Sequence, residues 1–208
     1  MTAALTRGRY ASQILPPTKV IGLNQLTVTE LTLAGVKLVE RRHIDDARGF
    51  VSRLFCAKEL RAAGWTKPIV QINHSYTARR GTVRGMHFQY PPYAEIKLVS
   101  CIRGEVWDVV VDVRAGSTNF LRWQSERLSA HNGRALLIPE GFAHGFQALT
   151  DNVELLYCHS AAYTTTAESG LNAKDPTLAI SWPLRITELS SRDSQHPMLD
   201  ERFAGVKA

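Results

Sequence analysis

The sequence predicts an all-β fold built around a single core. The 208 residues suffice for one sizeable domain, and a hydrophobic content of 44% with a charged content of 21% is close to the average of globular proteins. From residue 69 onward, eight short runs rich in β-branched residues are separated by Gly, Pro and Asn. This spacing favours a sandwich or closed barrel over a parallel α/β sheet.

We divide the chain into three parts. Residues 1–33 contain Pro16-Pro17 and show neither helical nor alternating periodicity. We expect an N-terminal arm that packs on the barrel or on a partner subunit, or is partly disordered. Residues 34–188 form the main domain. Residues 189–208 are polar and are expected to form a C-terminal extension in which a short helix is possible.

The main domain is expected to begin with a mixture of elements. Residues 35–40 read as a strand, 45–49 as a loop and 50–55 as a second strand. Residues 57–64 combine strong helix formers with a final glycine, which predicts one short helix.

The eight runs that follow supply the barrel, and the dipeptide Arg103-Gly104 is expected to form the hairpin turn between two of them. The predicted strands are residues 69–77, 82–89, 95–102, 105–113, 122–128, 134–138, 145–148 and 153–159.

The formal net charge of +6 would suit a nucleic acid, an anionic membrane or an anionic small molecule. Lys and Arg are scattered and no nucleic-acid motif is present, which favours the small molecule; a solvated basic surface is the alternative. We therefore expect neither a nucleic acid nor a membrane as partner.

The cysteines and the apolar segments indicate the compartment. Cys56, Cys101 and Cys158 are odd in number, widely spaced and set among apolar residues, which predicts buried free thiols in a reducing compartment. No segment has the length and apolarity of a signal peptide or a membrane span. The sequence thus predicts a cytoplasmic protein.

The stretch from Gly81 to His144 carries two half-motifs. A glycine, five residues and His87 in an H-x-Q triplet open it, and Gly133 followed by Pro139-x-Gly141-x-x-His144 closes it. This pairing resembles the cupin superfamily. The resemblance implies a cupin jelly-roll β-barrel with a few short helices.

The surrounding residues narrow the resemblance to one family. RGMHFQ at 84–89, KLV at 97–99, DVVVDVR at 108–114 and PEGFAHGF at 139–146 resemble the dTDP-4-dehydrorhamnose 3,5-epimerase family, and the similarity runs from about residue 48 to 183. Members of that family are usually homodimers without a cofactor. They act on a nucleotide-diphosphate sugar with a 4-keto-6-deoxy ring, inverting carbons next to the ketone.

His87 lies within a predicted strand, and a period of two places Gly85, His87 and Gln89 on one face. Many cupins bind a metal through H-x-H, a downstream Glu and the second-motif His. Here Gln89 replaces the second His, and Glu95 does not match the Glu position. Two imidazoles, those of His87 and His144, fall short of the usual three ligands of a catalytic metal, so we expect no metal.

The resemblance implies four catalytic residues. His87 would be the base, Asp175 the carboxylate that orients it, Lys97 the cation that stabilises the enolate, and Tyr157 the acid on the opposite face. Structural roles stay open on the sequence alone. Asp175 precedes a proline, as turn residues often do, and Tyr157 lies in an apolar run, as core aromatics do.

The resemblance also implies a substrate-binding set. Arg48, Arg84 and His144 would contact the diphosphate, Gln71 and Asn73 the base and ribose, and Tyr163 and Glu168 the sugar. We assign structural roles to Asp108 and to Asp112 paired with Arg114.

Three departures from the family pattern concern specificity. Arg53 stands where an acidic residue is usual, Ala173-Lys174 replaces a Trp-Asn or Trp-Asp pair, and Ile72 replaces a common acid. If Arg53 and Lys174 line the entrance, the substrate differs from the dTDP sugar of rhamnose synthesis. A C3-only epimerase, a ketoisomerase, a non-catalytic sugar-nucleotide-binding cupin and a metal-dependent cupin stay open as alternatives.

Overall fold

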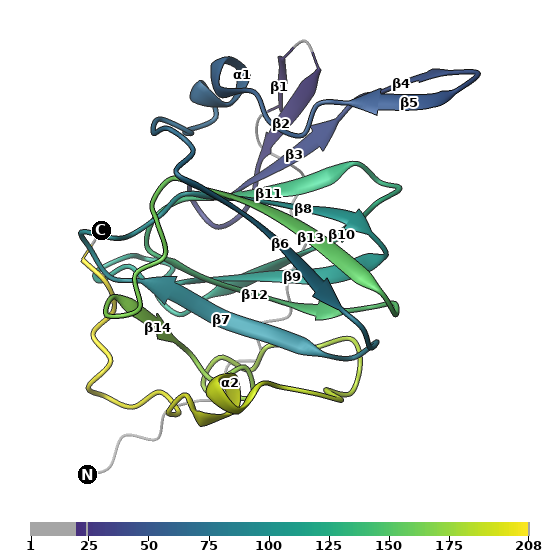
Figure 1. Ribbon diagram of the computed structural model, residues 1–208. Coiled ribbons are helices and arrows are strands. Elements are labelled where there is room, and N and C mark those ends of the chain that lie inside the picture. Colours follow the sequence, from purple (N-terminus) through teal and green to yellow (C-terminus); the bar gives the residue numbers. More distant parts are fainter. Residues whose placement is uncertain (1–19, 24, 208) are drawn as a thin grey trace.

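The computed structural model describes residues 20–23 and 25–207 as two antiparallel sheets packed face to face, with a short hairpin projecting from one of them (Figure 1). The predicted all-β cupin fold is confirmed. The seven-stranded sheet runs, in spatial order, β1 (Val20–Leu23), β2 (Leu26–Glu30), β3 (Lys37–Arg41), β11 (Arg134–Ile138), β8 (Lys97–Arg103), β13 (Val153–His159) and β6 (Gln71–Thr77).

The second sheet has five strands and carries the first half-motif near its edge. Its spatial order is β10 (Trp123–Ser129), β9 (Glu105–Asp112), β12 (Phe142–Ala148), β7 (Val83–Gln89) and β14 (Glu168–Gly170). The projecting hairpin joins β4 (His43–Asp46) to β5 (Gly49–Ser52). The helices are α1 (Ala57–Arg61) and α2 (Ser191–Gln195), and within the described part of the chain neither is long enough to cross a membrane.

All eight predicted strands of the barrel are present within a few residues of their expected bounds. The arm was predicted without strands, but its residues 20–23 and 26–30 extend the seven-stranded sheet by pairing with each other and with β3. The expectation for residues 1–19 lies outside the described residues. Of the loop expected at 45–49, only residues 47 and 48 form a turn, because residues 45 and 46 belong to β4 and residue 49 to β5. Neither β4 nor β14 was predicted.

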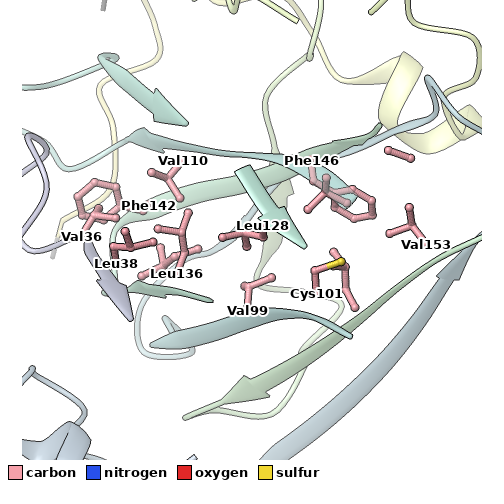
Figure 2. Packing of buried hydrophobic residues seen from close by; sticks show 14 of the residues in the cluster. Val36, Leu38, Val99, Cys101, Val110, Leu128, Leu136, Phe142, Phe146 and Val153 are labelled. Atoms are coloured by element: carbon pink, nitrogen blue, oxygen red, sulfur yellow. The ribbon is translucent and has the colours of Figure 1, made fainter. Parts of the chain in front are cut away.

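The main core lies between the two sheets. Apolar side chains of both sheets meet between them and are removed from water, and each fully buried large side chain contributes roughly 1.5–3 kcal/mol. Labelled side chains of this cluster pack between the ribbons in Figure 2. Its buried members include Val36, Leu38, Val99, Cys101, Val110, Leu128, Leu136, Phe142, Phe146 and Val153.

A close approach of two glycines lets β7 and β12 pair beside the half-motif histidines. Gly85 has a φ of +130°, and a Cβ on it would lie 2.4 Å from the Cα of Gly145. Only glycine fits here without displacing the neighbouring backbone. The register shifts locally, but His87 and His144 remain direct cross-strand partners and therefore share one end of the barrel.

The three cysteines are free thiols. Cys101 and Cys158 are buried as expected, and burial raises the pKa of Cys101 to about 12, which leaves it unreactive. Cys56, just before α1, is half-exposed, so the expectation of burial was wrong for this residue.

Candidate active site

A cavity of about 910 Å³ opens between the sheets and is lined by β6, β7, β8, β12, β13 and the C-terminal segment. Of the eleven predicted site residues, all but Arg48 and Asp175 line it. Those that do are Gln71, Asn73, Arg84, His87, Lys97, His144, Tyr157, Tyr163 and Glu168. Strand pairing therefore brings together residues that are spread over nearly a hundred positions of the chain.

His87 is held by a carboxylate from the C-terminal helix. Its Nε2 lies 2.8 Å from Oδ1 of Asp193, while Oδ2 of the same carboxylate accepts a hydrogen bond of 3.2 Å from the backbone amide of Gly85. His87 keeps 26% of its side-chain surface exposed, whereas Asp193 keeps only 3%. The imidazole is thus fixed in orientation and still reaches the cavity.

The charge of Asp193 is stabilised despite its burial. Burial by itself would raise the pKa of this carboxyl, but the hydrogen bond and positive charge of His87, with the Gly85 amide and Ser190, lower the pKa to about 2. Asp193 therefore stays ionised at neutral pH and accepts a hydrogen bond from the imidazole of His87. An imidazole–carboxylate pair of this kind can accept and hold a proton.

Tyr157 belongs to the opposite wall. It lies on β13 of the seven-stranded sheet, whereas His87 lies on β7 of the five-stranded sheet. The Tyr157 hydroxyl accepts a 3.4 Å hydrogen bond from Ser75, and burial raises the pKa of the phenol well above its ordinary value. The phenol therefore keeps its proton, and the cavity has a candidate acid facing a candidate base.

Lys97 is buried and already paired. Its Nζ lies 2.9 Å from Oε1 of Glu95 and donates a 3.4 Å hydrogen bond to the carbonyl oxygen of His87. The other oxygen of Glu95 is 3.1 Å from Nδ1 of His159. Burial would raise the pKa of Glu95, but the charges of Lys97 and His159 lower it. The ammonium thus sits in the cavity wall next to the base.

Arg84 and His144 differ in how accessible they are to a bound anion. Arg84 donates two 3.0 Å hydrogen bonds, to Thr77 Oγ1 and to the carbonyl of Tyr76, and stays exposed to the cavity. His144 is buried with its Nε2 2.9 and 3.0 Å from the two oxygens of Asp108. Arg84 is therefore the more available of the two.

With this geometry in place, comparison with known proteins decides the family. Residues 30–201 match the family described as dTDP-4-dehydrorhamnose 3,5-epimerase. The chain belongs to this family.

The matches to known proteins extend over most of this chain and most of each relative. The dTDP-4-dehydrorhamnose 3,5-epimerase of Sinorhizobium fredii is 42% identical over 180 residues, which are 86% of this chain and 92% of the relative. The dTDP-4-dehydrorhamnose 3-epimerase of Streptomyces niveus is 38% identical, covering 85% and 86%. The crystal structure of the Bacillus anthracis 3,5-epimerase with TDP and PPi bound superposes with a TM-score of 0.81 at 40% identity, covering 84% of this chain and 99% of that one.

The prediction that Asp175 is the carboxylate partner of His87 was wrong. Asp175 is buried but accepts hydrogen bonds from the backbone amides of Thr177 and Leu199, so it stabilises a turn and the following segment. The carboxylate at His87 is that of Asp193. A sequence signal existed: Ser190-x-x-Asp193 is a helix-start pattern, and the Ser190 hydroxyl indeed caps α2 through the Asp193 amide.

The helix α2 also brings Arg192 into the cavity, a residue that the sequence reasoning missed. Arg192 donates to Glu168 Oε2 at 2.8 Å and lies 3.3 Å from Nε2 of His87. Glu168 accepts the Tyr163 hydroxyl at 2.7 Å, and the Tyr163 amide donates to Gln71 at 3.0 Å. The predicted sugar-contacting residues thus form one network with the proposed base.

Three charged residues for which the sequence predicted a place at the site do not line this cavity. Arg48 lies on the turn of the projecting hairpin, 89% exposed and paired with Asp46. Arg53 pairs with Glu59, whose carboxylate also accepts the amides of residues 25 and 26, and Lys174 is exposed away from the lining. Arg53 is therefore committed to the packing of α1. The expectation that Arg53 and Lys174 line the entrance was wrong.

Asp112 and Arg114 are paired as predicted, with Arg114 Nη2 2.6 Å from Asp112 Oδ2.

The pairing of Asp193 predicts how stability depends on pH. Because its pKa falls to about 2 on folding, the carboxylate stabilises the fold above its ordinary pKa of ~4, and this contribution disappears as the pH falls from about 4 to about 2. Asp193→Asn should cost about 1 to 2 kcal/mol at pH 7. Between pH 4 and pH 2 it should lose less stability than the wild type. Denaturant unfolding at several pH values measures both, with the exposed Asp45→Asn as control; parallel curves for wild type and Asp193→Asn would contradict the prediction.

Proposed function

We propose that this chain is an epimerase of a dTDP-linked 4-keto-6-deoxy sugar in deoxysugar biosynthesis. The observation that carries the proposal is the placement of a His87–Asp193 pair and a protonated Tyr157 on opposite walls of one cavity. Epimerisation needs a base on one face of the ring and an acid on the other. The nucleotide is that of the relatives named above, and Arg84 supports it as an exposed cation.

The proposed reaction uses the acidity of the hydrogens next to the ketone. His87 removes one of these protons, and because Asp193 holds Nε2, the other ring nitrogen, Nδ1, accepts it. The negative charge moves to the ketone oxygen as an enolate, which the buried ammonium of Lys97 stabilises. Tyr157 then returns a proton to the opposite face of the carbon, which inverts it. Bulk water restores the proton of Tyr157 and removes that of His87.

The number of inverted carbons is the finer question. The relatives include both a 3,5-epimerase and a 3-epimerase at similar identity. Arg53, which we had considered as a specificity determinant, is paired with Glu59, so it does not argue for an unusual substrate.

We further propose a homodimer in the cytoplasm. The β4–β5 hairpin exposes Ile44, Phe50 and Val51 at 52%, 57% and 72%, a run of apolar surface that a second subunit would cover. β6, at one edge of its sheet, exposes Ile72 in the same way. A hairpin that crosses to a partner would carry Arg48 toward that subunit's cavity, which gives this residue the diphosphate role expected of it.

Solvent exchange tests the base and its partner together. In deuterium oxide, His87→Asn should slow deuterium uptake next to the ketone by ~100-fold to 10,000-fold, since a general base is missing. Asp193→Asn should also slow it strongly, because the imidazole loses its orienting charge, whereas the buried Asp175→Asn should leave exchange in the folded protein near the wild-type rate. Proton NMR of the substrate measures each rate. Exchange at wild-type rate in His87→Asn would end the proposal.

Tyr157→Phe separates proton removal from inversion. The variant keeps the ring and deletes the hydroxyl, so His87 should still wash deuterium into the sugar while inverted product falls by ~100-fold or more. NMR of the product sugar distinguishes retained from inverted carbons. If Tyr157→Phe forms product at the wild-type rate, the acid is another group.

The dimer proposal predicts a role for a residue outside its own cavity. Arg48→Ala should weaken dTDP binding about tenfold, the value of one charge-assisted hydrogen bond, without changing the sedimentation coefficient. Arg202 forms the same kind of surface pair, with Asp200 two residues earlier, so Arg202→Ala is a matched control. Equal dTDP affinity in the two variants, or a monomeric wild type, would refute this assignment.

A further inference from the structure

A second histidine stands beside the proposed base. His196, the residue that follows α2, offers a ring nitrogen to the same region as His87 and Asp193, and ligand atoms of the three residues all lie within 4.8 Å of one another. The rings of His87 and His196 are 6.1 Å apart at their centroids and meet edge to face. The proposed epimerase reaction uses His87 and Asp193 but gives His196 no task.

The surroundings of His196 hold its ring close to this pair. A Cβ at position 170 would lie 2.3 Å from His196 Nε2, so the ring occupies space that only glycine leaves open. Nε2 is buried and has no hydrogen-bond partner among the described residues. A buried imidazole nitrogen without a partner is costly, which makes a ligand at this ring favourable.

The donor set matches a borderline divalent metal. Two imidazoles and one carboxylate suit Zn²⁺ and its neighbours in the first transition row, whereas Mg²⁺ and Ca²⁺ prefer oxygen ligands. Zinc bonds of roughly 2.0–2.2 Å at tetrahedral angles place ligand atoms about 3.3 Å apart. His87 Nε2 and Asp193 Oδ1 are already at 2.8 Å, so a modest rotation of His196 would complete the set.

We propose that His87, Asp193 and His196 form an inhibitory Zn²⁺ site. A metal on Nε2 of His87 leaves the remaining ring proton on Nδ1, so the ring has no free lone pair to act as a base. Metal binding and proton abstraction therefore exclude each other. This ligand set shares only His87 with the cupin half-motifs; its other members come from the C-terminal segment. The inhibition rests on the proposed epimerase function, whereas the binding of the metal does not.

Arg192 opposes the metal and sets its affinity. Its guanidinium lies 3.3 Å from His87 Nε2 and 3.6 Å from the Asp193 carboxylate, where it would repel a cation. Its side chain is 53% exposed, so it can move away from His87 into solvent without being buried. Removing the charge should therefore tighten zinc binding.

The experiment measures binding and inhibition separately on the full-length protein. Calorimetry with zinc chloride at pH 7.5, and the visible spectrum with Co²⁺, should report one ion per chain in the wild type. His196→Ala should weaken binding at least about tenfold and should turn over substrate normally in the presence of a chelator. Arg192→Gln should bind more tightly. His131→Ala, which removes an exposed histidine of the β10–β11 turn, should match the wild type.

Each outcome decides the proposal. Loss of both zinc binding and zinc inhibition in His196→Ala supports it, with His196→Gln as a second variant if the alanine form melts at a lower temperature without metal. A wild type that binds no stoichiometric Zn²⁺ or Co²⁺, or a His196→Ala that binds as the wild type does, overturns it. If Zn²⁺ binds stoichiometrically and depends on His196, but the protein exchanges no substrate protons, the metal site is supported. Only the proposed epimerase function is then refuted.

Discussion

The hydrogen bond between His87 and Asp193 is the interaction on which the arrangement of the site depends. It joins β7 to α2 across 106 positions of the chain. A buried carboxylate costs several kcal/mol unless it is paired and hydrogen-bonded, and Asp193 meets this demand with the imidazole of His87 and the amide of Gly85. Because a carboxylate of α2 binds two residues of β7, the C-terminal segment is part of the cavity wall and not an appendage.

The same demand explains the other charges of the wall. Lys97 faces Glu95, a partner of opposite charge, and the buried carboxylate of Asp108 is hydrogen-bonded to His144. Burial raises the pKa of Asp108, although His144 favours its charged form. Such pairs add little net stability, and the apolar cluster between the sheets supplies what they do not. Arg192, which is 53% exposed and paired with Glu168, can exchange this contact for one with a ligand.

Base chemistry and metal binding meet at His87 because both use the same nitrogen lone pairs. The proposed base is oriented by a carboxylate and reachable from the cavity, and these are also the properties of a good ligand. A neighbouring histidine on a different segment therefore changes what the site can bind, while the strand pairing stays the same. In this chain the neighbour is His196, placed by the end of α2 and by the space above Gly170.

The sequence by itself determined the barrel and most of the cavity. Alternating runs specify which strand face is apolar, and the half-motifs place His87 and His144 on strands that pair, so nine predicted residues meet in one cavity. Only the tertiary structure decided which aspartate serves His87. Asp175 lies in the loop after β14 and Asp193 in the polar C-terminal extension. The capping pattern at Ser190 indicates a helix start, but it does not tell which of the two aspartates contacts β7. The strands at 20–23 and 26–30 were likewise decided by pairing, because short runs become strands only when a partner supplies their hydrogen bonds. The choice of aspartate rests on a hydrogen bond between residues 106 positions apart, which no local pattern encodes.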